Sequence, residues 1–333
     1  MRAFLIEEVF LISDIYDAYV DPNYYTLNSP DHNVLRRVVV QKGNVASRYI
    51  YAEQLWNSQQ DIYVFRANKE SYVPFNKNNP ILIMDGQNGA AAGGHTQTWE
   101  YANRTNEWFV GTKPKNKWTT QIARVHISSS TSRYTSNTQL PRLSYLNRAG
   151  SQQGINYAGA DLKRVEAAVS PDYQYFMIAT IDRYNTGYFS IYYLDDINTA
   201  LDNAGVNDVN IQTLTSVKAF IIPNFVDNIG SIQGYDIDNG ANYIYVSSQH
   251  SPGYEDISRK IVKIPWGSQN PSEWDFVRLD SNSTINSFSG NYQTEFESVQ
   301  VIDNNNVWLT VAYHDMDTST NLTVMNRIYK VSW

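Results

Sequence analysis

The chain repeats one strand pattern five times. Each copy begins with a short strand-like run, continues through a turn often containing Asn, Asp or Gly, and returns in an aromatic strand such as Tyr243-Ile244-Tyr245. The copies start near residues 38, 96, 165, 232 and 296. An internal repeat restricts the fold to architectures in which each copy is one structural unit packed against its neighbours.

The repeat length and the residue types indicate an all-β fold. A set of equivalent positions gives successive spacings of 57, 69, 67 and 64 residues, and these positions are Val40, Gln97, Glu166, Gln233 and Glu297. The 25 Tyr, 12 Phe and 8 Trp are interleaved with Ile, Val and Thr, which favour a pleated, half-buried surface. We therefore predict a five-bladed β-propeller that forms a single domain over residues 1–333, with a β-sandwich as the alternative.

The last copy differs from the others because no fourth strand follows Arg327–Ser332. Residues 3–12 are an apolar segment ahead of the first repeat. We expect residues 3–12 to pair with Arg327–Ser332, so that the N-terminal strand completes the last blade and leaves no open sheet edge. Helical periodicity is scarce, and Ile197–Ala204 is the one short helix that we expect.

Composition excludes several classes of function. The chain has no cysteine, so disulfides and thiol nucleophiles are absent. Its 26 Lys and Arg against 33 Asp and Glu give a net charge of −7, which does not suit sequence-independent binding of nucleic acid. No run approaches the roughly 18 apolar residues of a membrane helix, and the first residues do not resemble a secretory signal. No motif indicates a cofactor.

The connectors between copies indicate where a site would lie. Antiparallel strands place the links from each fourth strand to the next copy on the same face as the turns between second and third strands. These links are the long ones, and they span residues 85–95, 147–164, 223–231 and 280–295. Variable loops on a rigid scaffold usually carry function. We expect the site on this long-loop face.

Three histidines fall on the long-loop face of the predicted ring. His95 ends one connector, while His250 and His314 follow their second strands by the same step, which reaches Trp56, Lys115 and Asp182 in other copies. One interpretation is a zinc-type ligand set. The alternative is that separate blades hold these side chains about 10 Å or more apart. We favour the alternative and predict no metal.

A polar column begins the innermost strands at Gln97, Glu166, Gln233 and Glu297. The residue that follows is always small, namely Thr98, Ala167, Gly234 or Ser298. Glu166 and Glu297 could act as general acid and base on a glycoside. Alternatively, these groups hydrogen-bond neighbouring loops or water in a channel, as buried polar groups must. We favour the second interpretation and assign no catalytic residue.

Several strings resemble the helveticin J family, and the resemblance runs from about Val38 to the C-terminus. The strings are Val40-Gln41-Lys42-Gly43-Asn44-Val45, Gly93-Gly94-His95-Thr96-Gln97-Thr98-Trp99-Glu100, Gln121-Ile122-Ala123-Arg124-Val125, Pro141-Arg142-Leu143-Ser144-Tyr145-Leu146-Asn147-Arg148-Ala149-Gly150-Ser151, Glu166-Ala167-Ala168-Val169-Ser170-Pro171-Asp172-Tyr173, Ser231-Ile232-Gln233-Gly234-Tyr235-Asp236 and Leu309-Thr310-Val311-Ala312-Tyr313-His314. The resemblance implies a large class III bacteriocin of lactobacilli, released from the producing cell without an ordinary signal peptide and active against related bacteria. It supplies no catalytic residue.

We predict a secreted or surface-associated antibacterial protein that recognises a cell-envelope component of related bacteria. Aromatic rings and amides suit a glycan, so we expect the long-loop face to bind one. The predicted ligand-binding residues are His95, Gln97, Trp99, Glu166, Gln233, Gln249, His250, Tyr313 and His314. One alternative is a glycoside hydrolase or lyase that uses Glu166, Glu297 or Asp236. Another is an interaction or aggregation protein. The sequence leaves the oligomeric state open.

Overall fold

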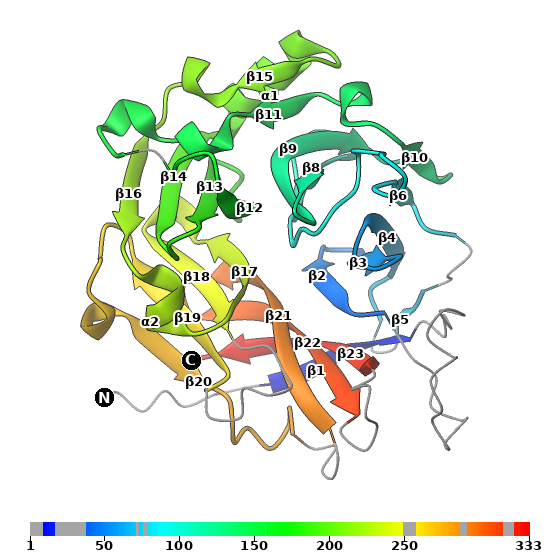
Figure 1. Cartoon of the computed structure of the whole chain (residues 1–333). Helices are drawn as coiled ribbons and strands as arrows, with labels where there is room; N and C mark the ends of the chain where they lie inside the picture. The colour runs from blue at the N-terminus through cyan, green and yellow to red at the C-terminus, as the bar shows by residue number, and fades with distance from the viewer. Residues whose placement is uncertain are drawn as a thin grey trace.

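Five small sheets surround a central axis, as Figure 1 shows. The structure is a computed structural model that describes residues 9–16, 38–70, 73–75, 79–156, 158–248, 258–286, 292–315 and 323–333. Each sheet is one blade, and the strands of the first four blades follow one another outwards from the axis in sequence order, whereas two strands from the first quarter of the chain lie at the outer edge of the last blade. The prediction of a five-bladed β-propeller is confirmed.

Blades 1 to 3 follow one another in the first two thirds of the chain. Blade 1 contains, from the axis outwards, β2 (Val40–Val45), β3 (Tyr49–Trp56), β4 (Asp61–Asn68) and β6 (Leu82–Met84). Blade 2 contains β7 (Trp99–Tyr101), β8 (Glu107–Lys115), β9 (Trp118–His126) and β11 (Arg142–Ser144). Blade 3 contains β12 (Leu162–Val169), β13 (Tyr175–Asp182), β14 (Gly187–Tyr193) and β16 (Lys218–Ile222).

Blades 4 and 5 complete the ring. Blade 4 contains β17 (Ile232–Ile237), β18 (Tyr243–Ser248), β19 (Lys260–Pro265) and β20 (Asp275–Arg278). Blade 5 begins with β21 (Tyr292–Asp303), β22 (Asn306–Asp315) and β23 (Thr323–Ser332). Aromatic and β-branched runs form the buried middle of the sheets.

Two outer strands cross from one blade to the edge of the previous one. β10 (Ser132–Tyr134) pairs in parallel with β6, and β15 (Asp208–Asn210) pairs in parallel with β11. Both come from the connector between the third and fourth strands of the following blade. The sequence pattern did not predict them, because three-residue strands lack a detectable period. They cover sheet edges that would otherwise expose unpaired backbone groups.

The N-terminal strand lies beside the last strand of blade 5. β1 (Val9–Tyr16) is antiparallel to β23, with Val9 opposite Val331, and β5 (Val73–Pro74) adds in parallel to β1. Of the predicted segment 3–12, residues 3–8 lie outside the described residues. Closure of the ring by the whole predicted segment therefore stays a prediction.

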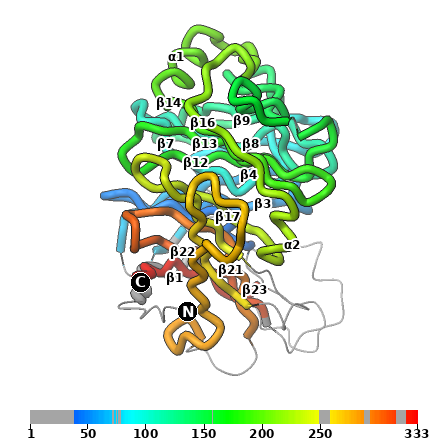
Figure 2. Tube along the Cα trace, turned by 90° about the vertical axis from the view of Figure 1, so that its left-hand side faces the viewer, coloured from blue at the N-terminus to red at the C-terminus, as the bar shows by residue number. Residues whose placement is uncertain are grey.

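Helices are few and peripheral. α1 (Leu194–Ala204) starts three residues before the predicted Ile197, because Leu194 is buried together with Ile197 and Leu201. α2 (Phe225–Ile229) lies in the connector between blades 3 and 4, and Figure 2 shows α1 at one end of the molecule, far from β23. No helix in the described ranges has the length and apolar character needed to cross a membrane. Short 3-10 turns occur at Asn137–Gln139, Leu146–Arg148, Ser151–Gln153, Ile211–Thr213, Asn239–Ala241 and Pro271–Glu273.

The hydrophobic core lies between neighbouring blades. Phe109 of blade 2 packs edge-on against Phe176 of blade 3, with ring centroids 4.7 Å apart. Tyr245 of blade 4 belongs to one buried cluster with Phe296 and Val299 of blade 5. Apolar side chains therefore fill the spaces between sheets, and the polar residues of the innermost strands are left to face the axis.

Candidate functional site

The innermost strands bring the predicted polar column together at the axis. The side-chain amide nitrogen of Gln97, Nε2, lies 3.1 Å from Oε1 of Gln41, 3.1 Å from Oε1 of Gln233 and 3.0 Å from Oε2 of Glu297. All four side chains are buried. One amide thus connects blades 1, 2, 4 and 5, and this network fills the middle of the channel.

Blade 1 contributes Gln41 to this column, which corrects the sequence alignment that used Val40. Val40 is fully buried in an apolar cluster. The pairing between β2 and β3 shifts between Val40 and Lys42, so Gln41 is an extra, bulged residue. A bulge turns the following side chains towards the other side of the strand, and the alternation pattern of the sequence does not reveal it.

Glu166 is engaged by its neighbours on both oxygens. Oε2 accepts hydrogen bonds from Thr98 Oγ1 at 2.6 Å and from the Gln97 backbone nitrogen at 3.0 Å. Oε1 lies 3.1 Å from Nε of Arg164, a buried ion pair. Arg164 also donates to Gln97 Oε1 and to the Gln233 carbonyl. A charge held this way is fixed in place rather than presented to a ligand.

Glu297 and Glu295 form an acidic pair beside this network. Burial and the adjacent Glu295 raise the pKa of Glu297 well above its usual range, although Arg164 and Gln97 oppose the shift. Glu295 accepts hydrogen bonds from Gln233 Nε2 at 2.9 Å and contacts Nε2 of His314 at 3.0 Å. His314, predicted to bind ligand, is thus buried against a carboxylate of its own blade.

The other predicted histidines and aromatics occupy different surroundings. His95 stacks on Trp118 with centroids 3.7 Å apart, and burial, with Arg164 and Lys117, lowers the pKa of His95 to about 3. Trp99 and Tyr313 are buried in the core, so neither ring is exposed to solvent. Gln249 and His250 lie outside the described residues. The predicted ligand-binding set stays a prediction.

Of the remaining positions of the predicted ring of loop residues, two contact their own blades, whereas Lys115 contacts Ala160 and Asp161 in the connector to blade 3. Trp56 stacks on Tyr63 at 4.6 Å, and Asp182 accepts hydrogen bonds from the backbone nitrogens of Tyr184 and Thr186. Within the described ranges no group of three or more His, Asp or Glu side chains is placed to hold a metal ion.

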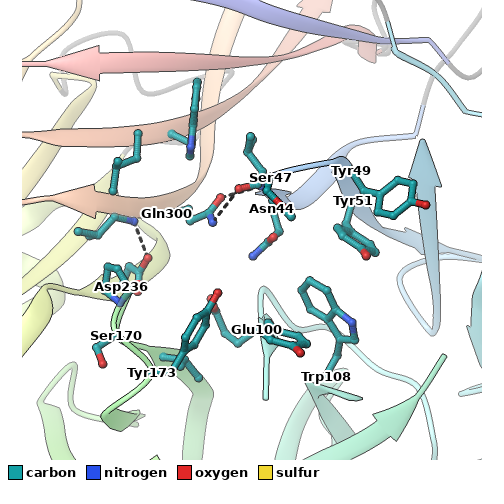
Figure 3. A pocket seen from close by; sticks show the side chains of 18 of the residues that line it. Asn44, Ser47, Tyr49, Tyr51, Glu100, Trp108, Ser170, Tyr173, Asp236 and Gln300 are labelled. Carbon is teal, nitrogen blue, oxygen red and sulfur yellow. Dashed lines mark hydrogen bonds between the residues drawn. The ribbon is translucent and has the colours of Figure 1, made fainter. Parts of the chain in front are cut away.

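A cavity of about 560 Å³ opens at the end of the axis opposite the long-loop face, where turns join the first and second strands of the blades. We call it the axial cavity. Figure 3 shows Tyr51 and Trp108 on one side of the open space and Asp236 and Ser170 on the opposite side. Its lining comprises Asn44, Val45, Ala46, Ser47, Arg48, Tyr49, Tyr51, Glu100, Tyr101, Trp108, Val169, Ser170, Pro171, Tyr173, Asp236, Gln300, Val301, Ile302 and Trp308.

Aromatic rings form one continuous wall of the axial cavity. Trp108 contacts Tyr51 at 4.4 Å and Tyr101 at 5.4 Å between centroids, and Tyr101 contacts Tyr173 at 5.6 Å. The predicted ligand residue Trp99 stacks behind Trp108 at 4.8 Å, with their planes 5° apart. Trp99 therefore supports the wall from the core and fixes the orientation of Trp108.

Polar groups of the innermost strands form the rest of the lining. Asp236 accepts hydrogen bonds from the backbone nitrogens of Val301 at 2.6 Å and Ile237 at 2.8 Å. Gln300 bonds the backbone of Val45 in both directions, donating at 3.3 Å and accepting at 2.7 Å. Asn44 and Glu100 complete this set. Asp236 and Gln300 lie across the open space from Tyr51 and Trp108, whereas Glu100 lies on the same strand as Tyr101 (Figure 3).

Lys42 lies beneath the axial cavity and is completely buried. Its ammonium is 2.7 Å from Oε1 of Glu100 and donates to the Val299 carbonyl at 2.9 Å. Burial lowers the pKa of Lys42, but Glu100 and Asp236 outweigh burial and raise it above the usual value. The side chain therefore stays charged and joins the innermost strands of blades 1, 2 and 5.

Comparison with known proteins identifies the family. The family model described as bacteriocin helveticin-J matches residues 20–333. Bacteriocin helveticin-J of Lactobacillus helveticus is 41% identical over 340 residues, which cover 93% of this chain and 97% of that protein. The chain belongs to the helveticin J family.

Among solved structures that resemble this helveticin J family member, a phage tail fibre shares its fold. The tail fibre of Staphylococcus aureus phage P68 has a TM-score of 0.54 at 9% identity, covering 98% of this chain and 52% of that one. The chain therefore spans about half the length of the tail fibre. A GH62 hydrolase in complex with xylotriose has a TM-score of 0.43 at 13% identity, covering 92% of this chain and 94% of that one.

Sequence reasoning missed the axial cavity, although a signal for it exists in this helveticin J chain. Asn44, Glu100, Asp236 and Gln300 each follow a member of the polar column by three residues. Alternation alone assigns such positions to the opposite face of a strand. The inner strands of blades 1, 4 and 5 are irregular at the column, which lets both positions face the axis.

Proposed function

We propose that this helveticin J family member is a secreted antibacterial protein that binds a cell-envelope glycan in the axial cavity. The observation that carries the proposal is the wall of aromatic rings facing amide and carboxylate groups across one cavity. Sugar rings have apolar faces that stack on aromatic side chains and hydroxyl edges that need hydrogen bonds. A cavity with both kinds of lining suits such a ligand.

Burial directs this proposal to the axial cavity rather than to the predicted set of residues. Trp99 and Tyr313 are in the core, and Gln97, Glu166 and Gln233 bond one another in the channel. Tyr173, by contrast, lines the cavity and keeps 42% of its surface exposed. An exposed ring at a cavity rim can contact a ligand without unfolding the blade.

The test is binding of the full chain to isolated cell walls of related lactobacilli, together with growth inhibition of the same strains. Tyr173→Ala should weaken wall binding about three- to tenfold, since it removes one stacking surface. Tyr184→Ala is the matched control, because Tyr184 is 65% exposed and does not line the cavity. Equal binding by both variants and the wild type would overturn the assignment of the cavity.

Release of reducing sugar from the same walls distinguishes binding from hydrolysis. Glu100 and Asp236 are the carboxylates of the axial cavity, whereas Glu166 and Glu297 lie in the channel network. Glu100 is paired with the Lys42 ammonium, which does not favour acid–base work on a glycoside. We expect no release of sugar. Sugar release that Asp236→Asn abolishes would instead assign a hydrolase.

A further inference from the structure

A second concavity, of about 440 Å³, lies beside blade 2 on the long-loop face. We call it the lysine cleft. One wall is the hairpin between β8 and β9, and the other wall is the chain around β11 and the start of blade 3. Its lining includes Lys113, Lys115, Thr120, Tyr145, Asn147 and Arg148.

Positive charge is concentrated in the lysine cleft. Lys113, Lys115 and Arg148 line it, against Asp208 as the carboxylate of the lining. Within the described ranges no carboxylate lies within ion-pair distance of Lys113, and Lys115 has a long, exposed contact of 3.4 Å with Asp161. Exposed ion pairs of this kind contribute little to the free energy of folding. This local excess of cations occurs in a chain whose net charge is −7.

Neutral groups of the cleft complement these cations. The Tyr145 ring is 55% exposed, and Asn147 and Thr120 supply an amide and a hydroxyl. Arg148 is oriented by a hydrogen bond of 3.0 Å from Nη1 to Gln212 Oε1. An exposed ring beside cations and hydroxyl-binding groups suits a ligand that has both a sugar or polyol part and an anionic part.

Both walls of the cleft contain backbone in the left-handed region. The φ angles are 57° at Lys113 and 58° at Tyr145. Such conformations are unfavourable for residues other than glycine and concentrate at sites where the chain must hold side chains in fixed positions. Here they occur where the hairpin and the facing chain present Lys113 and Tyr145 to the same cleft.

We propose that the lysine cleft binds the phosphate group of a phosphorylated sugar or polyol-phosphate chain. Phosphate accepts several charge-assisted hydrogen bonds, and lysine and arginine are its usual partners. A concave site with Asp161 and Asp208 near its rim favours a narrow chain over a flat anionic membrane surface. The site is separate from the axial cavity, so this proposal does not depend on the first one.

The experiment measures binding of the full chain to a synthetic glycerol phosphate oligomer by calorimetry. The cleft variant Lys113→Gln/Lys115→Gln should bind at least about tenfold more weakly, because two cations that contact phosphate are removed. The control variant Lys69→Gln/Lys330→Gln changes net charge equally, outside the cleft, and should bind within about twofold of the wild type. Thermal unfolding of each variant checks that it is folded.

Three further ligands test whether binding in the cleft requires an anion and which kind of anion it prefers. Binding of uncharged dextran should not depend on the cleft lysines. Binding of phosphatidylglycerol vesicles or single-stranded DNA more tightly than the oligomer would overturn the proposal in favour of a membrane or nucleic-acid surface. Failure of the wild type to bind the oligomer, or equal loss in both lysine double variants, would also overturn it.

Discussion

Lys42 directly follows Gln41 of the polar column. At the same position the other four blades have the small residues Thr98, Ala167, Gly234 and Ser298. The side chain of Lys42 is completely buried. Its ammonium then reaches Glu100 of blade 2. A buried ion pair gains stability only when both partners are present, so this contact ties two blades to each other.

Lys42→Met tests that pair. The variant keeps the length of the side chain but leaves the Glu100 carboxylate buried without its cation, which should cost about 3–5 kcal/mol in the free energy of unfolding. Lys42→Met/Glu100→Gln removes both charges and should recover a large part of the loss. Urea unfolding of the two variants measures this, and equal losses in both would show that the charge pair is not the cause.

Glu53 in β3 is a second buried carboxyl group near Lys42, and it lacks a hydrogen-bond donor among the described residues. Burial raises the pKa of Glu53 well above the ordinary 4.5, Glu166 and Glu100 add to the shift, and Lys42 opposes it. A raised pKa in the folded state means that folding takes up a proton. The stability that this proton contributes is present below pH 4.5 and is lost as pH rises through the folded pKa.

Glu53→Gln should therefore be more stable than the wild type at alkaline pH. Between the unfolded pKa near 4.5 and the raised folded pKa, the difference should grow by about 1.4 kcal/mol per pH unit, and above the folded pKa it should stay constant. Asp236 and Glu297 also have raised pKa values and remain in the variant, so its own pH dependence will not vanish. Urea unfolding from pH 4 to 9 gives the comparison, and parallel curves would contradict it.

At the scale of elements, the innermost strands must approach one another closely, and glycine permits this between blades 1 and 5. The backbone nitrogen of Gly43 in β2 lies 3.2 Å from Ser298 Oγ and 3.2 Å from Thr310 Oγ1. A Cβ at Gly43 would lie 2.5 Å from Thr310 Oγ1 and 2.7 Å from Ile328 Cδ1. The first blade therefore has no space for a side chain where it meets the last blade.

Gly43→Ala should destabilise the protein by about 1–3 kcal/mol, because the added methyl group overpacks this contact. Thr310→Ala removes one of the two colliding groups, so Gly43→Ala/Thr310→Ala should lose less than the sum of the single variants. Chemical unfolding of the three variants forms a double-mutant cycle. Additive losses would show that the two residues do not meet.

At the scale of the whole molecule, we expect closure of the ring to depend on pairing between segments from the two ends of the sequence. β1 pairs with β23, and Phe10 lies opposite Lys330. A propeller without such a pairing would leave a sheet edge open in its last blade. Since the chain has no cysteine, a designed disulfide can test this register directly.

Phe10→Cys/Lys330→Cys should form a disulfide under oxidising conditions, because directly opposed residues of antiparallel strands lie within disulfide range. The cross-link should raise the free energy of unfolding by about 2–4 kcal/mol relative to the reduced form. Phe10→Cys/Lys113→Cys pairs the same strand with a distant hairpin and should not cross-link. Failure of the first pair to oxidise would contradict closure by this strand.

The sequence alone determined the five-bladed fold and the family. Repetition of aromatic strands and turns is a local property, since each copy forms its own sheet and buries the same alternating positions. The polar column at Gln97, Gln233 and Glu297 could be predicted for the same reason. The contacts of the Gln97 side-chain amide with Gln233 and Glu297 could not be predicted. These partners are 136 and 200 positions away in the sequence and meet Gln97 only when the ring forms.

The axial cavity and the lysine cleft were decided by the tertiary structure alone. Bulges in the innermost strands turn Asp236 and Gln300 towards the axis, and alternation in the sequence does not record a bulge. Burial likewise decides that Trp99 supports a wall while Tyr173 borders the opening, although both are aromatic residues in matching strings. Local pattern fixes which residues form strands; only the packing of the blades fixes which side chains remain open to a ligand.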